Sequence, residues 1–303
     1  MSDLPRIIVV GSANLDLVFN CPQLPLPGQT LLGGTFMTHP GGKGANQAAA
    51  IGKLGGNVDF VACLGDDANG HVVLESIEGA NVSTRFIRRG KEATGTASIV
   101  VDTEGRNMIV VASGANMEVS PEQVADSFAG GPYSVVLTQL EVPMETVAAA
   151  SWADRFILNP APAQEIPAEI LARCAVLTPN ETEAEGLTGI CPSSPEGCRE
   201  AGRKLLDSGV ENVIITLGER GCILINGQGE IAFPARSVKP VDTVGAGDAF
   251  NGALAMFLAE TEDLMISIPR AIAVAGLSTT KPGAVEAMPT FEELRGFAPD
   301  LFS

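Results

Sequence analysis

A carboxylate follows three small residues in the stretch PVDTVGAGDAFNG at residues 240–252. Gly245, Ala246 and Gly247 lead directly into Asp248, and an apolar pattern of helical spacing follows, made of Phe250, Leu254, Phe257 and Leu258. This order predicts a helix N-terminus, where free N–H groups and the helix dipole attract anions. Asp248 is then a candidate general base beside a candidate phosphate cradle, which indicates phosphoryl transfer to a hydroxyl group. The alternative for the same segment is an Asp N-cap after a glycine turn.

A second glycine cluster, Gly41–Asn46, stands directly before an alanine-rich segment with a helical pattern. It does not match a P-loop, because the first P-loop glycine would fall at Met37 and Gly44 replaces the required Ser or Thr. The cluster instead predicts a turn of close backbone approach, with Lys43 and Asn46 on the first helical turn. Both side chains suit hydrogen bonds to a polyol. A glycine-rich helix start with a solvated lysine is the alternative.

Two polar residues, Asn14 and Asp16, follow the first apolar run. Residues two apart in an extended segment point to the same face. A carboxamide and a carboxylate on one face can donate to and accept from neighbouring hydroxyl groups. Asx-turn chemistry in a loop is the alternative for the same pair.

Two further clusters stand where predicted strands end. In the stretch 178–183, Asn180 and Glu183 are one helical turn apart. The Glu183 carboxylate could hold Mg²⁺ through water, because Mg²⁺ keeps much of its hydration, and a helix start with acids that suit the dipole is the alternative. In the stretch 216–221, a glycine turn follows a strand end and either admits nucleotide phosphates or merely connects two strands.

Short apolar runs bounded by turn residues predict the elements that position these clusters. The predicted strands are Ile7–Val10, Val58–Leu64, Val135–Leu140, Phe156–Leu158, Ala175–Leu177 and Val213–Leu217. Helical patterns between most of them are Ala45–Leu54, Gly70–Ile77, Met144–Trp152, Glu181–Leu187 and Glu196–Ser208. This alternation predicts an α/β fold with a mainly parallel sheet. Right-handed crossovers then place the ends of the strands, and any ligand, along one edge.

Two regions interrupt this alternation. Residues 12–40 are rich in Pro, Gly and polar residues, and residues 94–112 are typical of a hairpin with its turn at Thr103–Arg106. Together they predict a small sheet that acts as a lid over the edge of the main sheet, or else a hairpin without function. Because uncovered sheet edges seek partners, we expect a homodimer joined through the lids.

The composition restricts the class of protein. Among 303 residues, 36 are acidic and 19 basic, a net charge of −17 that argues against binding to nucleic acid or to an anionic membrane. The six cysteines form no CxxC pair and only two histidines occur, so zinc-type spacing is absent. Neither a signal-peptide core nor a run of about 18 apolar residues is found, so we expect a cytoplasmic protein with reduced thiols.

The chain closely resembles the ribokinase branch of the PfkB carbohydrate kinases in the order of its motifs. These motifs are Asn14 and Asp16, GGKGAN, Glu141, NETE, TLGERG and DTVGAGD. The resemblance spans nearly the whole chain, and its most specific parts are GGKGANQA near residue 41 and DTVGAGDAFNG near residue 242. It implies one doubly wound α/β domain over residues 1–303 with a β-sheet lid. It also implies an ATP-dependent kinase for the primary 5-hydroxyl of D-ribose that uses Mg²⁺ and is activated by K⁺.

The resemblance also implies a role for each matching residue. The base is Asp248, with Gly245, Ala246 and Gly247 as the anion hole. The sugar contacts are Asn14, Asp16, Gly42, Lys43, Asn46 and Glu141. The ATP contacts are Asn180, Thr216, Gly218 and Gly221, with Glu183 near the magnesium. The K⁺ site consists of Asp242, Val244, Ser278 and Gly283, and this chain departs from the family pattern at Ala287, where many members carry a serine.

Other functions stay open at this point. A nicotinamide oxidoreductase shares the fold class, but its glycine fingerprint fails after the first apolar run and again near residue 245. A sugar sensor derived from a kinase would keep the sugar contacts and lose the base or the anion hole, whereas both are intact here. A kinase for 2-deoxyribose, fructose or a nucleoside such as pseudouridine is a further alternative. The single Trp and single Tyr offer little for stacking a purine.

Overall fold

Alternating apolar residues build the central sheet of the computed structural model, which describes residues 4–302. In β1 (Arg6–Val10), Ile7 and Val9 pack into one hydrophobic cluster, whereas Ile8 and Val10 pack into a second cluster. All four side chains are at most 1% exposed. Because successive side chains of a strand point to opposite faces, both faces of this sheet must be covered.

Within the described residues, nine strands form this sheet in the order β13-β12-β11-β10-β9-β8-β1-β4-β5. The strands other than β1 are β4 (Asn57–Gly65), β5 (Ser83–Gly90), β8 (Val135–Thr138), β9 (Phe156–Leu158), β10 (Cys174–Leu177), β11 (Asn212–Thr216), β12 (Cys222–Asn226) and β13 (Gly229–Phe233). Neighbouring strands from β11 to β5 are parallel, and β12 and β13 are added antiparallel at one edge. The predicted mainly parallel α/β sheet is confirmed.

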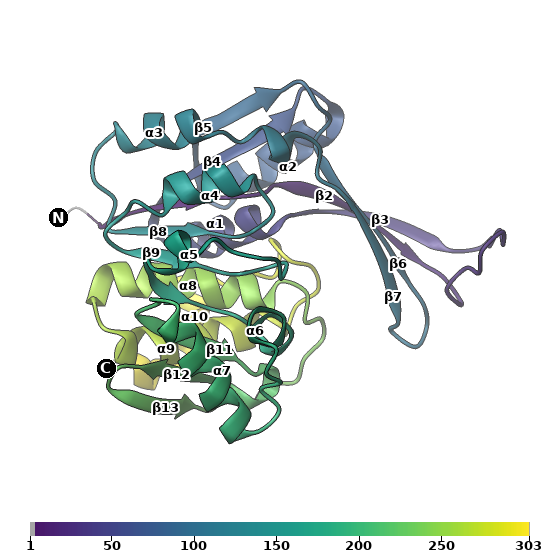
Figure 1. Cartoon of the computed structure of the whole chain (residues 1–303). Helices are drawn as coiled ribbons and strands as arrows, with labels where there is room; N and C mark the ends of the chain where they lie inside the picture. The colour runs from purple at the N-terminus through teal and green to yellow at the C-terminus, as the bar shows by residue number, and fades with distance from the viewer. Residues whose placement is uncertain (1–3, 303) are drawn as a thin grey trace.

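Helices cover the two faces of this sheet (Figure 1). One face carries α1 (Lys43–Lys53), α2 (Ala68–Gly79), α8 (Ala246–Thr261), α9 (Leu264–Ser278) and α10 (Phe291–Phe297). The other face carries α3 (Pro121–Phe128), α4 (Met144–Ala150), α5 (Ala168–Leu171), α6 (Glu181–Thr188) and α7 (Pro195–Asp207). The fold is therefore doubly wound, as the sequence predicts. None of the helices in residues 4–302 is both long and apolar enough to cross a membrane.

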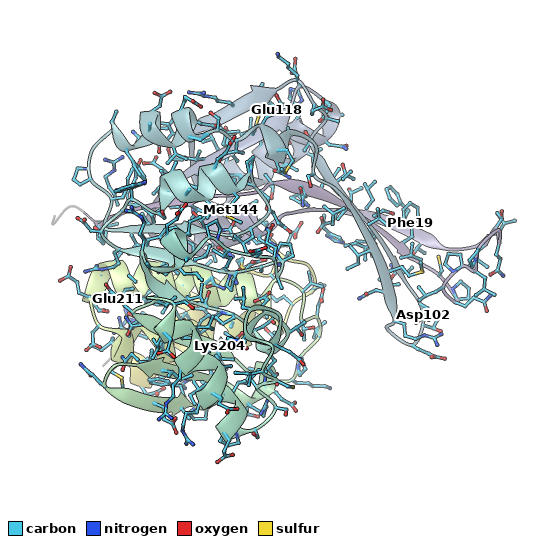
Figure 2. All side chains as sticks on the ribbon, viewed as in Figure 1. Phe19, Asp102, Glu118, Met144, Lys204 and Glu211 are labelled. Atoms are coloured by element: carbon cyan, nitrogen blue, oxygen red, sulfur yellow. The ribbon has the colours of Figure 1, made fainter. Side chains whose placement is uncertain are left out.

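A separate four-stranded sheet in the order β3-β2-β6-β7 extends away from the helices (Figure 1). Its strands are β2 (Asn14–Asn20), β3 (Thr35–Gly41), β6 (Gly95–Val101) and β7 (Asn107–Ala112). The predicted hairpin is β6 and β7, closed by hydrogen bonds across the turn from Asp102 to Arg106. The segment 12–40 supplies β2 and β3. Figure 2 shows Phe19 and Asp102 on this projecting part, far from Lys204 in the body.

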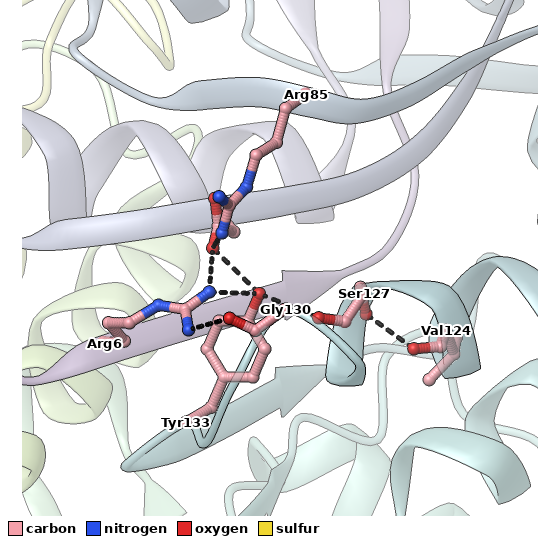
Figure 3. A network of polar contacts seen from close by, with 7 residues as sticks. Arg6, Arg85, Val124, Ser127, Gly130 and Tyr133 are labelled. Atoms are coloured by element: carbon pink, nitrogen blue, oxygen red, sulfur yellow. Dashed lines mark hydrogen bonds and ion pairs between the residues drawn. The ribbon is translucent and has the colours of Figure 1, made fainter.

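The strand β5 follows no apolar pattern, because Arg85, Arg88 and Arg89 interrupt it. It is fixed to the sheet in part by the Asp59 carboxylate of β4, which accepts hydrogen bonds from Arg85 at 2.6 Å, Arg6 at 3.1 Å and the Tyr133 hydroxyl at 2.8 Å (Figure 3). Burial raises the pKa of Asp59, but these hydrogen bonds outweigh it and hold the pKa below its usual range. The cluster joins β1, β4, β5 and the loop before β8.

Candidate active site

The helix α8 begins at Ala246, and its N-cap residue is Gly245 with φ 74°. This left-handed conformation favours glycine, and a Cβ atom there would lie 3.2 Å from the Cβ atom of Ala284. Asp248 is the third residue of the helix and makes no capping hydrogen bond. The predicted helix start is confirmed, and the alternative of an Asp248 N-cap is wrong, because the glycine itself occupies the cap position.

The Asp248 carboxylate is 8% exposed and is held by two side-chain amides of α1. Its Oδ2 atom accepts a hydrogen bond from Asn46 Nδ2 at 2.9 Å, and its Oδ1 atom accepts one from Gln47 Nε2 at 3.0 Å. Each carboxylate oxygen therefore keeps a lone pair for a further donor. Sequence reasoning missed Gln47, although it lies within the motif GGKGANQA.

The turn before Asp248 is open to solvent at Gly247. Ala246 N donates to Thr243 O at 3.3 Å, which closes the turn. A Cβ atom placed on Gly247 would meet no other heavy atom within 4 Å. The N-terminus of α8 can therefore receive an anion without displacing protein atoms.

Asn14 and Asp16 begin β2, next to the segment that leads into α1. Asn14 Oδ1 accepts a hydrogen bond from Asn116 Nδ2 at 2.7 Å. Gly42 has φ 87°, and a Cβ atom there would lie 2.8 Å from Asn14 N, so only glycine allows this approach. Burial raises the pKa of Asp16 to about 6, with further increases from the Glu141 and Asp248 carboxylates. A Cβ atom on Gly41 would clash with Asp16 Oδ2, so the Asp16 side chain packs against the segment that leads into α1.

Glu141 connects β1 to the start of α1. Its Oε2 atom accepts hydrogen bonds from Ser12 Oγ at 2.5 Å and from Lys43 N at 3.2 Å. Burial lowers the pKa of the Lys43 ammonium, but Asp248, Glu141 and Glu183 raise it by more. The structure therefore brings together the predicted sugar residues Asn14, Asp16, Gly42, Lys43, Asn46 and Glu141 around Asp248.

The predicted nucleotide residues lie at and after the ends of the neighbouring strands β10 and β11. Asn180 and Thr216 form a β-bridge, and Asn180 and Glu183 form a reciprocal capping box with both hydrogen bonds at 2.8 Å. The alternative for this pair, a helix start, is thus confirmed, and the nucleotide role stays a prediction. Gly218 has φ 56°, and Gly221, with φ 92°, lies so close to Phe233 O that no Cβ atom would fit.

Glu183 links these strand ends to the rest of the site. Burial raises the pKa of its carboxyl group, whereas the Asn180 N–H and the Lys43 ammonium lower it by less. Among residues 4–302, no three His, Cys, Asp or Glu side chains cluster as a metal site. A magnesium ion here would therefore be held by few carboxylates together with water and phosphate, which is the usual arrangement for Mg²⁺ in kinases.

Asp242 ties the segment before α8 to the segment after α9. Its Oδ1 atom accepts from Val244 N and its Oδ2 atom from Gly283 N, both at 3.0 Å. The hydroxyl group of Ser278 donates to Ala275 O at 2.8 Å, and the carbonyl of Ser278 accepts from Lys281 N at 3.3 Å. Three of the four predicted K⁺ residues are thus in direct contact, through N–H groups of Val244 and Gly283 that donate to the Asp242 carboxylate.

Lys53, which carries no sequence signal, also contacts this region. Its ammonium group donates to Val285 O at 2.7 Å and to Glu286 O at 3.2 Å, the two residues that directly precede the buried Ala287. The pKa of Lys53 is lowered, chiefly by burial. A protein cation therefore already binds two carbonyl groups of the segment where the family serine is missing.

Comparison with known proteins agrees with this geometry. The pattern of the pfkB family carbohydrate kinases matches residues 4–291. A ribokinase of Haemophilus influenzae is 37% identical over 298 residues, with 96% of this chain and 97% of that protein covered. A deoxyribokinase of Salmonella typhi is 34% identical over 300 residues, covering 96% and 98%.

A solved structure shares the fold over almost its entire length. The Arabidopsis thaliana ribokinase complexed with ribose and ATP superimposes with a TM-score of 0.88 at 32% identity, covering 97% of this chain and 98% of that one. This extent of similarity, in sequence and in fold, exceeds what a shared fold class requires. The chain belongs to the PfkB family of carbohydrate kinases and is an ATP-dependent sugar kinase.

Proposed function

We propose that this kinase transfers the γ-phosphoryl group of ATP to the primary 5-hydroxyl of D-ribose, with Asp248 as the general base. The observation that carries this proposal is the pair of hydrogen bonds from Asn46 and Gln47 to the two oxygens of a carboxylate at a helix N-terminus. A sugar hydroxyl is a poor nucleophile, and a carboxylate that accepts its proton during attack makes the oxygen more reactive.

The sugar site is proposed to lie between β2 and the first turn of α1. Asn46 Oδ1 is buried and has no hydrogen-bond partner among residues 4–302, so a hydroxyl donor from a ligand would satisfy it. Asp16 and Glu141 supply further acceptors, Asn14 and Lys43 supply donors, and Gly42 keeps the backbone clear of the ring. Donors and acceptors on neighbouring side chains are what vicinal hydroxyl groups require.

Phosphate binding is proposed at the turn of Gly245, Ala246 and Gly247. Backbone amides at a helix N-terminus stabilise the charge that spreads over the phosphoryl oxygens during transfer. The nucleotide is proposed to lie against Asn180, Thr216, Gly218 and Gly221. Mg²⁺ bound with ATP would neutralise phosphate charge, with Glu183 near it through water. Asp248, Glu141 and Glu183 raise the pKa of Lys43 and so favour its charged form, which makes this acidic site more favourable for an anion.

A monovalent cation site is proposed at Asp242, Val244, Ser278 and Gly283, where a bound K⁺ would fix the turn that carries the anion hole. The small sheet is proposed to act as a lid over the sugar. Its exposed apolar side chains support a homodimer formed through the lids, and they are Phe19, Phe36, Met37, Met108, Ile109, Val110 and Val111. We expect the enzyme in the cytoplasm, without nucleic acid or membrane partners.

A second candidate substrate is 2-deoxyribose, which the similarity to the Salmonella typhi deoxyribokinase favours. Fructose, pseudouridine or a sensor role are weaker alternatives. Measuring ADP release with ribose, 2-deoxyribose, fructose and pseudouridine tests them together. The proposal requires the highest kcat/KM with ribose. A higher value with 2-deoxyribose would reassign the substrate, and sugar binding without ADP release would indicate a sensor.

A further inference from the structure

A continuous chain of buried polar side chains lies behind the proposed base. Gln139, Asn159 and Thr178 are the first residues after β8, β9 and β10, which are adjacent in the sheet. These three side chains are at most 6% exposed. Parallel strands end at the same edge, so three successive strand ends present a polar group to the same region beneath α1 and α8.

Gln47 is the centre of this chain. Its Nε2 atom donates to Asp248 Oδ1 at 3.0 Å and to Asn159 Oδ1 at 3.1 Å, and its Oε1 atom accepts from Gln139 Nε2 at 2.5 Å. The side chain is completely buried. Both amide protons and the carbonyl oxygen are therefore engaged. A rotated amide would bring its oxygen against the carboxylate, so the neighbours fix a donor toward Asp248.

The same chain continues to the other side of the catalytic turn. Asn159 Nδ2 donates to Thr178 O at 3.2 Å, and Thr178 Oγ1 donates to Asn251 Oδ1 at 2.5 Å. Asn251 Nδ2 then donates to Gly247 O at 2.9 Å. The strand ends are thus connected both to the proposed base and to the backbone of the proposed anion hole.

Close packing of two helices makes this contact possible. Gly252 of α8 lies against α1, where a Cβ atom would be 2.5 Å from Gln47 O and 2.8 Å from the Cβ atom of Ala50. Without a side chain at Gly252, the two helices approach closely enough for the short chain of hydrogen bonds to close. The position of Gln47 relative to Asp248 is therefore set by its contacts with Gln139, with Asn159 and with the closely packed helix α8.

We infer that Gln47 is a positioning residue that holds the Asp248 carboxylate in its orientation. The inference rests on the proposed role of Asp248 as the base. Without the N–H donor of Gln47 to its Oδ1 atom, the Asp248 carboxylate loses one of the two side-chain contacts that fix it toward the attacking hydroxyl. Loss of the orientation lowers the rate of the chemical step far more than sugar binding.

The test compares Gln47→Met with the matched control Gln123→Met. Gln123 is also buried, at 2% exposed, and donates to Ala62 O and Phe86 O at the opposite part of the fold. We expect Gln47→Met to lower kcat roughly 10²-fold with little change in the KM for sugar. A residue needed only for stability would not separate kcat from KM in this way. Gln123→Met lowers thermal stability but leaves kcat and the KM for sugar unchanged.

A second variant covers a failure of Gln47→Met to fold. Gln47→Glu has the same shape but places an oxygen where the N–H donor to Asp248 Oδ1 was, so its kcat falls at least as far as that of Gln47→Met. A kcat no lower than that of Gln123→Met in the folded Gln47 variants would overturn the inference. Asp248→Asn separates the two claims: an inactive Asp248→Asn beside an unaffected Gln47→Met refutes only the positioning role, whereas an active Asp248→Asn refutes the base itself.

Discussion

Asp16 on β2 and His39 on β3 are directly opposite each other in the small sheet, so their side chains share one face. His39 Nδ1 lies 3.9 Å from Glu286 Oε1, in the segment that follows the Asp242 contact at Gly283. The same face of the small sheet therefore carries the predicted sugar carboxylate and contacts the loop that Asp242 ties to the turn before α8. His39 lowers the pKa of Asp16, against the larger effects of burial and Glu141.

The first prediction concerns the pH dependence that Asp16 imposes. Burial, followed by Glu141, raises its pKa from the ordinary 3.8 to about 6. The charged form accepts hydrogen bonds from hydroxyl groups, so kcat/KM for ribose rises as the pH increases through about 6 and then levels off. Asp16→Asn loses this limb and most of the sugar affinity, and calorimetry shows ATP binding retained. Equal losses of ATP and sugar affinity would remove Asp16 from the sugar site.

The same shift has a consequence for stability. The folded protein binds this proton more tightly than the unfolded chain, so the stability from Asp16 is present below pH 3.8 and is lost as the pH rises through about 6. Asp16→Asn therefore has a higher Tm than the parent at pH 7.5, and the difference disappears near pH 4. Asp207→Asn, at an exposed position of α7, is the control and changes Tm at neither pH. A lower Tm for Asp16→Asn at pH 7.5 would contradict the shift.

Gly247→Ala separates catalysis from stability. A Cβ atom at Gly247 meets no heavy atom within 4 Å, and a helical Gly→Ala change stabilises by up to about 1 kcal/mol. We expect an unchanged or higher Tm, together with a kcat lowered roughly tenfold or more, because the methyl group occupies the space proposed for phosphate. Gly296→Ala in α10 has the same open surroundings and serves as the control with normal kcat. Normal turnover of Gly247→Ala would place the phosphate elsewhere.

Apolar patterns predict a strand wherever it is buried on both faces, as in β1. The prediction fails where charged residues interrupt the pattern. β5 was not predicted because its pairing with β4 is fixed partly by Arg85 and Asp59, which are far apart in sequence. β2 and β3 were predicted only as part of a lid region, since their exposed, mixed residues give no period. Such strands depend on partners that a single segment does not reveal.

The site residues that stand in glycine-rich motifs were predictable, because those motifs require special backbone geometry at Gly42 and Gly245. Gln139 and Asn159 could not be predicted from the sequence, since each is a single amide after a strand. Only the fold shows that both contact Gln47, which lies between them. The contact of Lys53 could not be predicted either, because in the sequence Lys53 is an ordinary lysine at a helix end. Only the fold brings residues 285–286 beside it.

The prediction for the monovalent cation concerns the turn held by Asp242. We expect K⁺ to activate more than Na⁺ at matched ionic strength, because an ordered turn aims the amides of the anion hole before reaction. Ala287 offers no side-chain oxygen, so activation requires high K⁺. The assay titrates each chloride in a buffer free of both cations. A flat response to K⁺, with Asp242→Ala equally active, would leave Asp242 as a turn residue whose acceptors hold Val244 and Gly283.

The homodimer prediction places the interface on the exposed apolar side chains of β7. Val110 is 70% exposed and Ile109 is 53% exposed. A charge at either position must be desolvated at a dimer interface, so Val110→Glu shifts the mass measured by light scattering from dimer to monomer. Val72→Glu, at a 44% exposed position on α2, is the control and stays dimeric. A parent protein that is monomeric at micromolar concentration and fully active would exclude pairing through this sheet.

The central claim is that Asp248 accepts the proton of the attacking hydroxyl. Asp248→Asn keeps the side-chain volume at the start of α8 and removes the carboxylate, so the most direct measurement is kcat for ribose and ATP in this variant, with both affinities determined by calorimetry. The account predicts a kcat lowered roughly 10²–10⁴-fold, with both ligands still bound. Near-normal turnover by Asp248→Asn would contradict it and place the base on another residue.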